Sequence, residues 1–352
     1  MAIIDSDAHV IETDRTWDYF DEADLKYKPF TVTEPNDPTK EYWVFDGKLR
    51  AKRGNTGKTT TRESQEMLDV PARLRDMDKY GTDIQVLYPS LWTSLTFSSP
   101  QMERAICKSY NRWMAGVWRE GKGRLRWIAV LPAMSVDHAI EEMGFVKENG
   151  ACGVTMRGFE GEYHATDAHF FPMYEEASKL NLPVCFHAGI GNASVDEYLT
   201  RAAGQGNFLR FKWPVLGAFH SLIIGRIPEK FPDLRWGFVE VSSQWLPYVI
   251  GDIARRLAWR QGRFDDDRPK GDLLKENRFY VACQTNDDIP YVLQSAGGED
   301  NLVIGTDYGH ADTTSELTAI QRFQEETGLT PAIVQKIVDA NEIGRASCRE
   351  RV

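Results

Sequence analysis

The sequence has few cysteines, and they form no pattern. Its 352 residues include five, at positions 107, 152, 185, 283 and 348, and no two of them make a Cys-x-x-Cys pair. Cysteines inside apolar runs, as three of these are, are typical of small buried side chains in a reducing compartment. This excludes a disulfide-stapled secreted domain and a cysteine-ligated zinc finger, and it predicts a cytoplasmic protein.

Long apolar runs and an excess of positive charge are also missing. No apolar stretch approaches the roughly 20 residues that a membrane-spanning helix needs. Residues 1–9 lack the basic start and long apolar centre of a signal peptide. The formal net charge of -10 argues against a general affinity for nucleic acid. We therefore expect neither a membrane nor a nucleic acid as a partner.

The last eleven residues differ from the rest of the chain. Residues 342–352 (EIGRASCRERV) are rich in arginine and have no apolar period. They resemble the translation of a common short-read sequencing adapter. We therefore expect this tail to be non-native, with the natural protein continuing differently after about Asn341, and we exclude it from the reasoning on fold and function.

What the chain does contain is a regular alternation of strand and helix patterns. The first strand begins at Ile3 and Ile4, and helical and strand-like segments alternate from residue 67 onward. Strands are predicted at 84–89, 125–131, 153–157, 183–187, 234–241, 279–283 and 302–307. Helices are predicted at 68–80, 100–120, 135–148, 171–180, 214–227, 246–260, 288–296 and 315–327. Eight β–α units predict one (β/α)8 TIM barrel domain over residues 1–341.

An insertion of about residues 38–66 follows the first strand. It contains a hairpin pattern with Asp46-Gly47 at the turn, and then a Gly/Thr/Lys-rich loop at 53–62. Insertions of this kind in a barrel tend to overhang the active site.

Metal-competent side chains come at the ends of three predicted strands. Asp7 and His9 are two residues apart and share one side of the first strand, while His187 and Asp307 end the fifth and eighth. The carboxyl ends of barrel strands meet on one face, so we expect these four to bind one divalent metal ion. Taken singly, His187 fits a buried core histidine better than a ligand, and the alternative for Asp307 is an N-cap.

The same segments resemble a known family. DSDAH at 5–9, LPVCFHAG at 182–189, IGTDYGH at 304–310 and the Phe-Pro-x-Leu sequence at 231–234 are similar to hallmark segments of the amidohydrolase superfamily. The likeness is greatest to its amidohydrolase-2 branch, around aminocarboxymuconate-semialdehyde decarboxylase and the resorcylate-type decarboxylases. The resemblance implies a TIM barrel, one Zn²⁺ or Mn²⁺ ion, decarboxylation or hydrolysis, and a homodimer or higher homo-oligomer.

The chain departs from that family pattern at two places. Asp7 replaces the first histidine of the usual His-x-His pair, which favours a harder ion and keeps manganese open. Glu240 stands where many of these decarboxylases have a catalytic histidine at the end of strand six. Glu240 is therefore a candidate base, a binder of a cationic group, or a residue that orients another. His220 is a candidate for the missing imidazole, with a helix histidine near the rim as the alternative.

Three further residues are candidates for contact with substrate. Arg157 ends strand four, and its guanidinium matches the geometry of a carboxylate, although a salt bridge to Glu160 is the alternative. His310 follows strand eight and either faces substrate or shapes its loop. Trp213 either walls an aromatic pocket or packs in the core.

Two enzymatic functions fit these residues. The first is a metal-dependent, non-oxidative decarboxylase of a small aromatic or unsaturated carboxylic acid, in which Asp307 carries the proton to the carbon that loses CO2. The second is a hydrolase of an amide, ester or lactone, in which the metal activates water and Asp307 or Glu240 takes its proton. A barrel that only binds a ligand is the third, non-enzymatic hypothesis.

Overall fold

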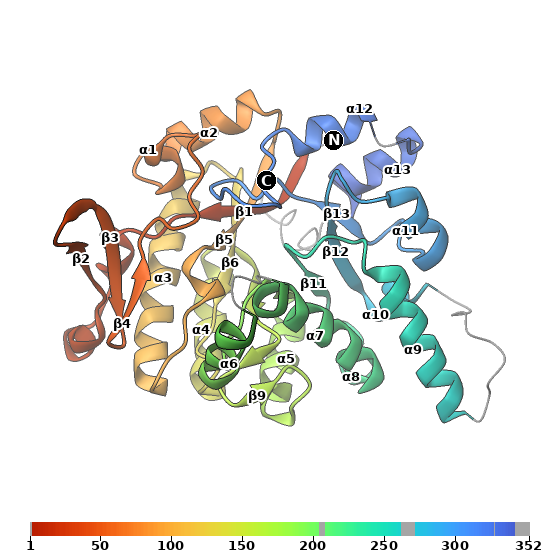
Figure 1. The fold of residues 1–352 in the computed structure, drawn as a ribbon, viewed down its shortest axis with the longest axis horizontal. Helices are drawn as coiled ribbons and strands as arrows, with labels where there is room; N and C mark the ends of the chain where they lie inside the picture. Colours follow the sequence, from red (N-terminus) through yellow and green to blue (C-terminus); the bar gives the residue numbers. More distant parts are fainter. Residues whose placement is uncertain (1, 204–207, 262–271, 327, 342–352) are drawn as a thin grey trace.

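The chain folds into a barrel of eight parallel strands surrounded by helices (Figure 1). The computed structural model describes residues 2–203, 208–261, 272–326 and 328–341. The strands lie side by side in chain order, and a parallel bridge between Ala8 and Tyr308 joins the first to the last. The strands are β1 (Ile4–Val10), β5 (Ile84–Pro89), β6 (Leu125–Val130), β7 (Ala151–Met156), β10 (Val184–Phe186), β11 (Trp236–Phe238), β12 (Phe279–Cys283) and β13 (Leu302–Ile304). The predicted (β/α)8 barrel is confirmed.

The strands are apolar because helices cover their outer side while the barrel fills its own interior. One cluster of buried side chains takes members from every strand or its end, and these include Ile4, Ile128, Cys152, Cys185 and Val303. A second, larger cluster joins the strands to the surrounding helices. Cys107, Cys152, Cys185 and Cys283 are all buried free thiols, as their apolar surroundings predict.

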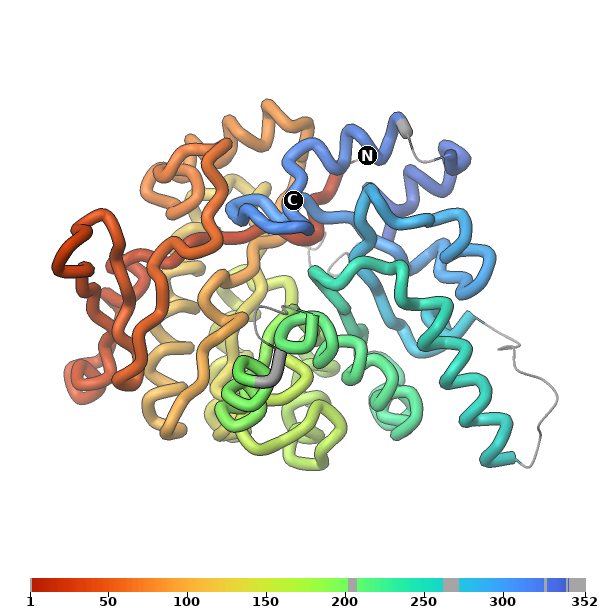
Figure 2. Tube along the Cα trace, viewed as in Figure 1, coloured from red at the N-terminus to blue at the C-terminus, as the bar shows by residue number. Residues whose placement is uncertain are grey.

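The chain passes around the barrel in sequence, from red to blue in Figure 2, with each unit beside the previous one. The helices of the eight units lie close to the predicted ranges. They are α2 (Val70–Lys79), α3 (Pro100–Glu120), α4 (Val136–Glu148), α5 (Phe171–Lys179), α7 (Trp213–Ile224), α9 (Leu246–Arg260), α11 (Ile289–Ala296) and α12 (Ala319–Glu326). Short helices add to them: α1 (Arg62–Gln65), α8 (Ile227–Lys230), α10 (Leu273–Asn277) and α13 (Pro331–Gln335). Within the described residues, no helix combines the length and the apolar character needed to span a membrane.

The segment after β10 differs from the sequence expectation, which placed only a polar loop there. It contains the helix α6 (Ala193–Ala203) and the π-helical turn η5 (Phe208–Lys212). The side chain of Asn192 accepts a hydrogen bond of 2.8 Å from the backbone N–H of Val195, which satisfies a donor at the start of α6. The feature of the sequence that marks this helix is therefore the capping residue Asn192, not an apolar period.

The insertion after β1 forms a three-stranded antiparallel sheet beside the barrel (Figure 1): β2 (Phe30–Glu34), β3 (Asp37–Phe45) and β4 (Lys48–Ala51). The predicted hairpin is confirmed, since Asp46 and Gly47 both have positive φ, at 48° and 70°, as a type I′ turn requires. The strand β2 was not predicted. It lies at the edge of this sheet with none of its side chains fully buried, although Phe30 and Val32 alternate with threonines as in a strand.

Candidate metal centre

The four predicted ligands converge at the carboxyl end of the barrel. The Nε2 atom of His9 lies 3.5 Å from Oδ1 of Asp7 and 3.4 Å from Oδ1 of Asp307. The Nε2 atom of His187 lies 3.7 Å from the same Oδ1 of Asp7. Side chains from β1 and from the ends of β10 and β13 thus face one point, although up to 300 residues separate them in the chain.

These facing atoms are buried and have no hydrogen-bond partner among the described residues. This holds for Oδ1 of Asp7, Nε2 of His9, Nε2 of His187 and Oδ1 of Asp307. A buried polar atom without a partner costs about 1–3 kcal/mol, so four of them at one point would be strongly unfavourable for the apoprotein alone. A cation placed among them satisfies all four. Two imidazoles with two carboxylates fit a zinc or manganese ion.

The backbone at this end of the barrel is held in an uncommon conformation. Glu240, Ser242 and Asp307 all have positive φ, between 50° and 65°, although none is glycine. Such residues cost about 1–3 kcal/mol each and cluster at functional sites. A Cβ atom added at Gly305 would lie 2.2 Å from Cβ of Asp7, so only glycine lets the end of β13 approach β1 this closely.

The Asp307 carboxylate is oriented by two hydroxyl groups. Its Oδ2 atom accepts hydrogen bonds from Oγ1 of Thr314 at 3.0 Å and from Oγ of Ser315 at 2.5 Å. Its Oδ1 atom therefore faces His9, and it also lies 2.8 Å from Nδ1 of His310. Asp307 is not an N-cap, because α12 begins twelve residues later.

Behind the ligands lies Asp5, which sequence reasoning did not single out. Its fully buried carboxylate accepts hydrogen bonds from the backbone N–H and the hydroxyl of Thr306, at 2.9 and 2.6 Å, and from Nε2 of Gln85 at 2.9 Å. Arg73 completes the network by donating to Oε1 of Gln85 at 2.6 Å and to the carbonyl of His9 at 3.0 Å. Burial raises the pKa of Asp5 to about 6, against the opposing effect of the bonds from Thr306. Asp5 thus ties β1 to the strand end that carries Asp307.

Changing Asp5→Asn is expected to weaken metal binding by about 10–100-fold, because outer partners orient the ligands. The NH2 group of the asparagine would then face Nε2 of Gln85, which is also a hydrogen-bond donor. The Gln85 amide cannot turn round to offer its Oε1 atom, because that atom accepts a hydrogen bond from Arg73. Titration of the apoprotein with Mn²⁺ measures the effect. Asp233→Asn, at an exposed position before β11, is the matched control. Unchanged affinity in Asp5→Asn would show that the network has no such role.

The structure places Glu240 beside the candidate ligands. Its Oε2 atom lies 3.1 Å from Nε2 of His187 and has no hydrogen-bond partner in the described part of the chain. Burial raises the pKa of Glu240 well above its ordinary value, and the carboxylates of Asp307 and Asp7 add to that rise.

His220 is not brought to this cluster. It lies on α7, and its Nε2 atom contacts Oδ2 of Asp252 on α9 at 3.0 Å. Its ring therefore joins two outer helices, which corresponds to the alternative of a helix histidine.

Arg157 does not face the site either. Its buried guanidinium donates from Nε to Glu160 at 2.9 Å, from Nη2 to the same carboxylate at 2.5 Å, and from Nη1 to the carbonyl of Trp92 at 2.8 Å. This matches the salt bridge to Glu160 rather than a clamp for substrate. Trp213 is 42% exposed and stacks on Phe159, with ring centroids 6.0 Å apart, at the start of α7.

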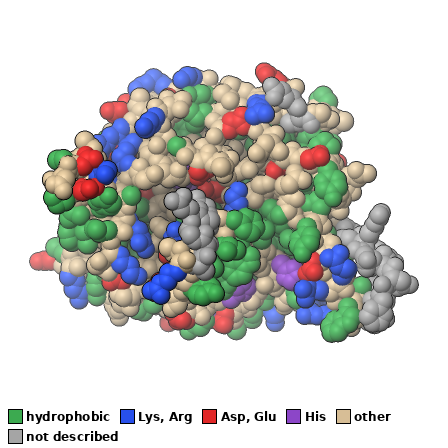
Figure 3. Space-filling view, in the orientation of Figure 1, with side chains coloured by type: hydrophobic (Ala, Val, Ile, Leu, Met, Phe, Trp, Pro, Cys, Tyr) green, Lys and Arg blue, Asp and Glu red, His purple; other side chains and the backbone are tan. Residues whose placement is uncertain are grey.

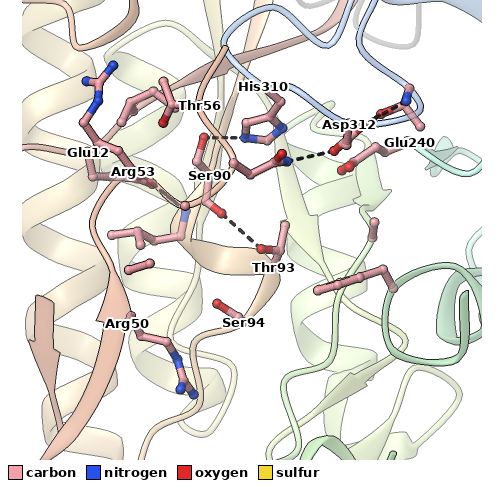
Figure 4. Close-up of a pocket in the computed structure, with 18 of the residues that line it drawn as sticks. Glu12, Arg50, Arg53, Thr56, Ser90, Thr93, Ser94, Glu240, His310 and Asp312 are labelled. Carbon is pink, nitrogen blue, oxygen red and sulfur yellow. Dashed lines mark hydrogen bonds between the residues drawn. The ribbon is translucent and has the colours of Figure 1, made fainter. Parts of the chain in front are cut away.

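A cavity of about 630 Å³ opens beside the cluster (Figure 4). The insertion contributes residues 49–56 to its wall, and Glu240, His310 and Asp312 also line it. The return of the insertion is anchored there, because Asn55 donates to Asp312 at 2.8 Å and Thr56 pairs with the backbone of His310. The beginning of the predicted loose loop at 53–62 is therefore held in place.

Five basic side chains contribute to the wall of the cavity, and Lys and Arg side chains lie around the hollow in Figure 3. The basic lining residues are Arg50, Lys52, Arg53, Arg210 and Lys212. Lys52, Arg53 and Arg210 form ion pairs with acidic neighbours, whereas Arg50 and Lys212 have no ion-pair partner among the described residues. Sequence reasoning missed this set because it is scattered over two segments without a motif.

Glu12 also lines the cavity and was missed. Its buried carboxylate accepts a hydrogen bond of 3.2 Å from the backbone N–H of Leu91, which fixes the loop after β5. Burial raises the pKa of Glu12 to about 7.

Comparison with known proteins gives a consistent result. A family model described as amidohydrolase matches residues 4–341. The chain is 23% identical over 268 residues to the 2-amino-3-carboxymuconate-6-semialdehyde decarboxylase of Dictyostelium discoideum, covering 74% of this chain and 73% of that protein.

Two solved structures share the fold over nearly their whole length. An amidohydrolase from Mycobacterium avium subsp. paratuberculosis K-10 has a TM-score of 0.77 at 17% identity, covering 99% of both chains. The 5-carboxyvanillate decarboxylase of Novosphingobium aromaticivorans DSM 12444 was solved with manganese and 4-hydroxy-3-methoxy-5-nitrobenzoic acid. It has a TM-score of 0.69 at 15% identity, covering 97% of this chain and 94% of the other.

Proposed function

Because the chain belongs to the amidohydrolase family, whose model spans residues 4–341, we propose that it is a metal-dependent, non-oxidative decarboxylase. Its substrate is a small aromatic or unsaturated carboxylic acid. The observation that carries this proposal is the convergence of four potential ligand atoms at the carboxyl end of the barrel, where they are buried and make no hydrogen bond within the described part of the chain. The two relatives above whose names state a reaction are both decarboxylases, which favours this function over a hydrolase.

The residues that would hold the ion are Asp7, His9, His187 and Asp307. A divalent ion in such a site acts as a Lewis acid that stabilises negative charge on substrate oxygens. The carboxylates at Asp7 and Asp307 suit manganese as well as zinc, and a related structure contains manganese.

Asp307 is the residue we assign to proton transfer. Thr314 and Ser315 donate hydrogen bonds to its Oδ2 atom, and these bonds fix the carboxyl group beside His9. In the reaction, the bond between the ring or vinyl carbon and the carboxylate breaks and CO2 leaves. The electron pair left on that carbon then takes the proton of the protonated Asp307 carboxyl group, which regains a proton from solvent before the next turnover. Lys212 and Arg50, on the cavity wall, attract the substrate carboxylate from solvent.

The first test is elemental analysis of protein purified without a chelator. We expect about one equivalent of zinc or manganese in the wild type, and its loss in a His9→Ala/His187→Ala double variant, because both imidazoles are ligands. His138→Ala, on α4, is the control histidine. Incubation with aromatic and unsaturated acids should then release CO2 from the wild type and from His138→Ala, but not from the double variant.

Other results would separate the alternatives. Products of amide, ester or lactone cleavage without CO2 would favour the hydrolase. Failure of the wild type to hold either ion, even after reconstitution, would overturn the metal-dependent function.

A cytoplasmic homodimer or higher homo-oligomer is also part of the proposal. Exposed apolar side chains along α6, η5 and α7 provide a surface suited to self-association, with Tyr198 70% and Phe208 55% exposed. Light scattering coupled to gel filtration measures the mass in solution, and a monomer would contradict this part.

A further inference from the structure

Glu12 is a buried acidic side chain on the cavity wall that has no part in the proposed reaction. It lies just after the end of β1, three positions beyond His9, and only 2% of it is exposed. It lines the cavity together with Leu91 and Thr93 of the loop after β5, and Figure 4 labels it there. A polar group so deeply buried needs partners, so the partners of this carboxylate decide what it can do.

The protein itself supplies little to this carboxylate. Within the described residues, its hydrogen-bond donor is the backbone N–H of Leu91, whose nitrogen lies 3.2 Å from both carboxylate oxygens. One donor shared between two oxygens is a long and weak arrangement, whereas an ionised carboxylate offers about four acceptor positions. Burial raises the pKa of Glu12 to about 7, against the smaller opposing effect of nearby backbone N–H groups. Most of the hydrogen-bonding capacity of Glu12 is therefore unused.

No cation forms an ion pair with Glu12 in the part of the chain that the structure describes. Two basic side chains that the insertion brings to the cavity wall are engaged elsewhere, since Lys52 pairs with Asp14 at 2.8 Å and Arg53 pairs with Glu66. A buried carboxylate without a counter-charge is unfavourable, and a donor group that approaches it gains a correspondingly strong hydrogen bond. The partner that Glu12 lacks is therefore left to a molecule in the cavity.

Two other fully buried glutamates show how a structural carboxylate differs from Glu12. Glu160 forms an ion pair with Arg157, and Glu103 accepts a hydrogen bond of 2.8 Å from the backbone N–H of Met134. Neither belongs to the cavity wall as the structure describes it. Glu12 alone of the three combines burial, access to the cavity and incomplete partners, and this combination is typical of a group that binds a ligand.

We propose that Glu12 determines which acids the cavity accepts, by accepting a hydrogen bond from a hydroxyl or amino group of the substrate. The inference deepens the proposed function and rests on it for the decarboxylation itself. It adds the class of acid, namely one with a hydrogen-bond donor placed away from the carboxylate that is lost. A second anionic group at that position would be repelled by Glu12. An apolar group there would leave Glu12 buried without a partner, which is how a polar site rejects analogues that lack the donor.

The test is the binding of matched benzoates to the purified protein in the presence of Mn²⁺, measured by isothermal titration calorimetry. The probes are hydroxybenzoates, aminobenzoates and methoxybenzoates substituted at each ring position. A pH of 8 lies above the pKa of Glu12, so its carboxyl group is mostly ionised. At one ring position, we expect the hydroxyl or amino acid to bind at least about 10-fold more tightly than its methoxy counterpart. The hydroxyl and amino series show which donor Glu12 binds.

Glu12→Gln is the variant that tests the assignment. The glutamine oxygen can still accept the hydrogen bond from Leu91, so the loop after β5 keeps its anchor. The amide then presents an NH2 group to the cavity, and two donors cannot pair. Affinity for the hydroxyl or amino acid should fall about 10-fold or more, while affinity for the methoxy acid stays the same or rises. Glu148→Gln, at an exposed position at the end of α4, is the matched control and should behave as the wild type.

Three results would overturn the role of Glu12. The wild type binds none of the acids or shows no preference for a donor, Glu12→Gln keeps that preference, or the variant loses affinity for both kinds of acid equally. The last of these would identify a purely structural side chain. CO2 release tests the proposed function separately. A preference that depends on Glu12, without CO2 release from any acid, would leave this inference standing and remove the decarboxylase.

Discussion

Replacing Asp307 with asparagine is expected to lower kcat for decarboxylation by about 10²–10⁴-fold, the usual contribution of a positioned proton donor. The amide has nearly the shape of the carboxylate, and its oxygen can still accept the hydrogen bonds from Thr314 and Ser315. The group facing His9 and His310 would then be an amide nitrogen, which cannot deliver a proton to carbon.

The measurement is the rate of CO2 release at saturating substrate, with the metal content of each sample determined in parallel. A variant that keeps its ion and loses kcat, with little change in KM, would identify Asp307 as the proton donor. A variant that loses the ion as well would show that Asp307 acts chiefly as a ligand. Activity near the wild-type level in Asp307→Asn would exclude both roles. Asp233→Asn again serves as the control.

Replacing Arg157 with methionine is expected to destabilise the protein by about 3–5 kcal/mol, because it leaves the buried carboxylate of Glu160 without its partner. The guanidinium also donates to the carbonyl of Trp92, so the loop after β5 would lose a hydrogen bond at the same time. Urea unfolding followed by tryptophan fluorescence reports the free energy of unfolding.

The double variant Arg157→Met/Glu160→Leu is the matched control. Replacing both members of a buried ion pair with apolar side chains is often close to neutral, so most of the lost stability should return. If Arg157 instead clamps the substrate, the single variant would keep its stability and show a raised KM. That result would contradict the structural role seen here.

The ligand positions of the candidate site could be predicted from the sequence for a simple reason. Apolar runs mark the strands, and a parallel barrel directs every carboxyl end to one face. If the segments between the strands form helices, the strand ends must meet on that face. The four residues at those ends therefore meet as well: Asp7, His9, His187 and Asp307. No knowledge of side-chain contacts was needed, because the period of the pattern and the direction of the strands are enough.

The roles of Arg157, His220 and Asp5 could not be predicted in the same way. Each depends on a partner that the chain brings close only when folded. Glu160 takes the guanidinium of Arg157, Asp252 takes the ring of His220, and Thr306 binds Asp5 across 301 positions of sequence. Residue type alone suggested substrate binding for Arg157, catalysis for His220 and nothing for Asp5.

The sequence by itself determined the number and direction of the strands, the turn at Asp46-Gly47 and the end of the barrel where the ligands gather. Local periods and turn preferences act over a few residues, so they can be recognised in one chain. The tertiary structure alone decided which buried polar atoms face one another, how the insertion lines the cavity, and that His310 and Asp312 lie beside Glu240. Those outcomes depend on burial and on contacts between distant segments, and both exist only after the barrel has closed.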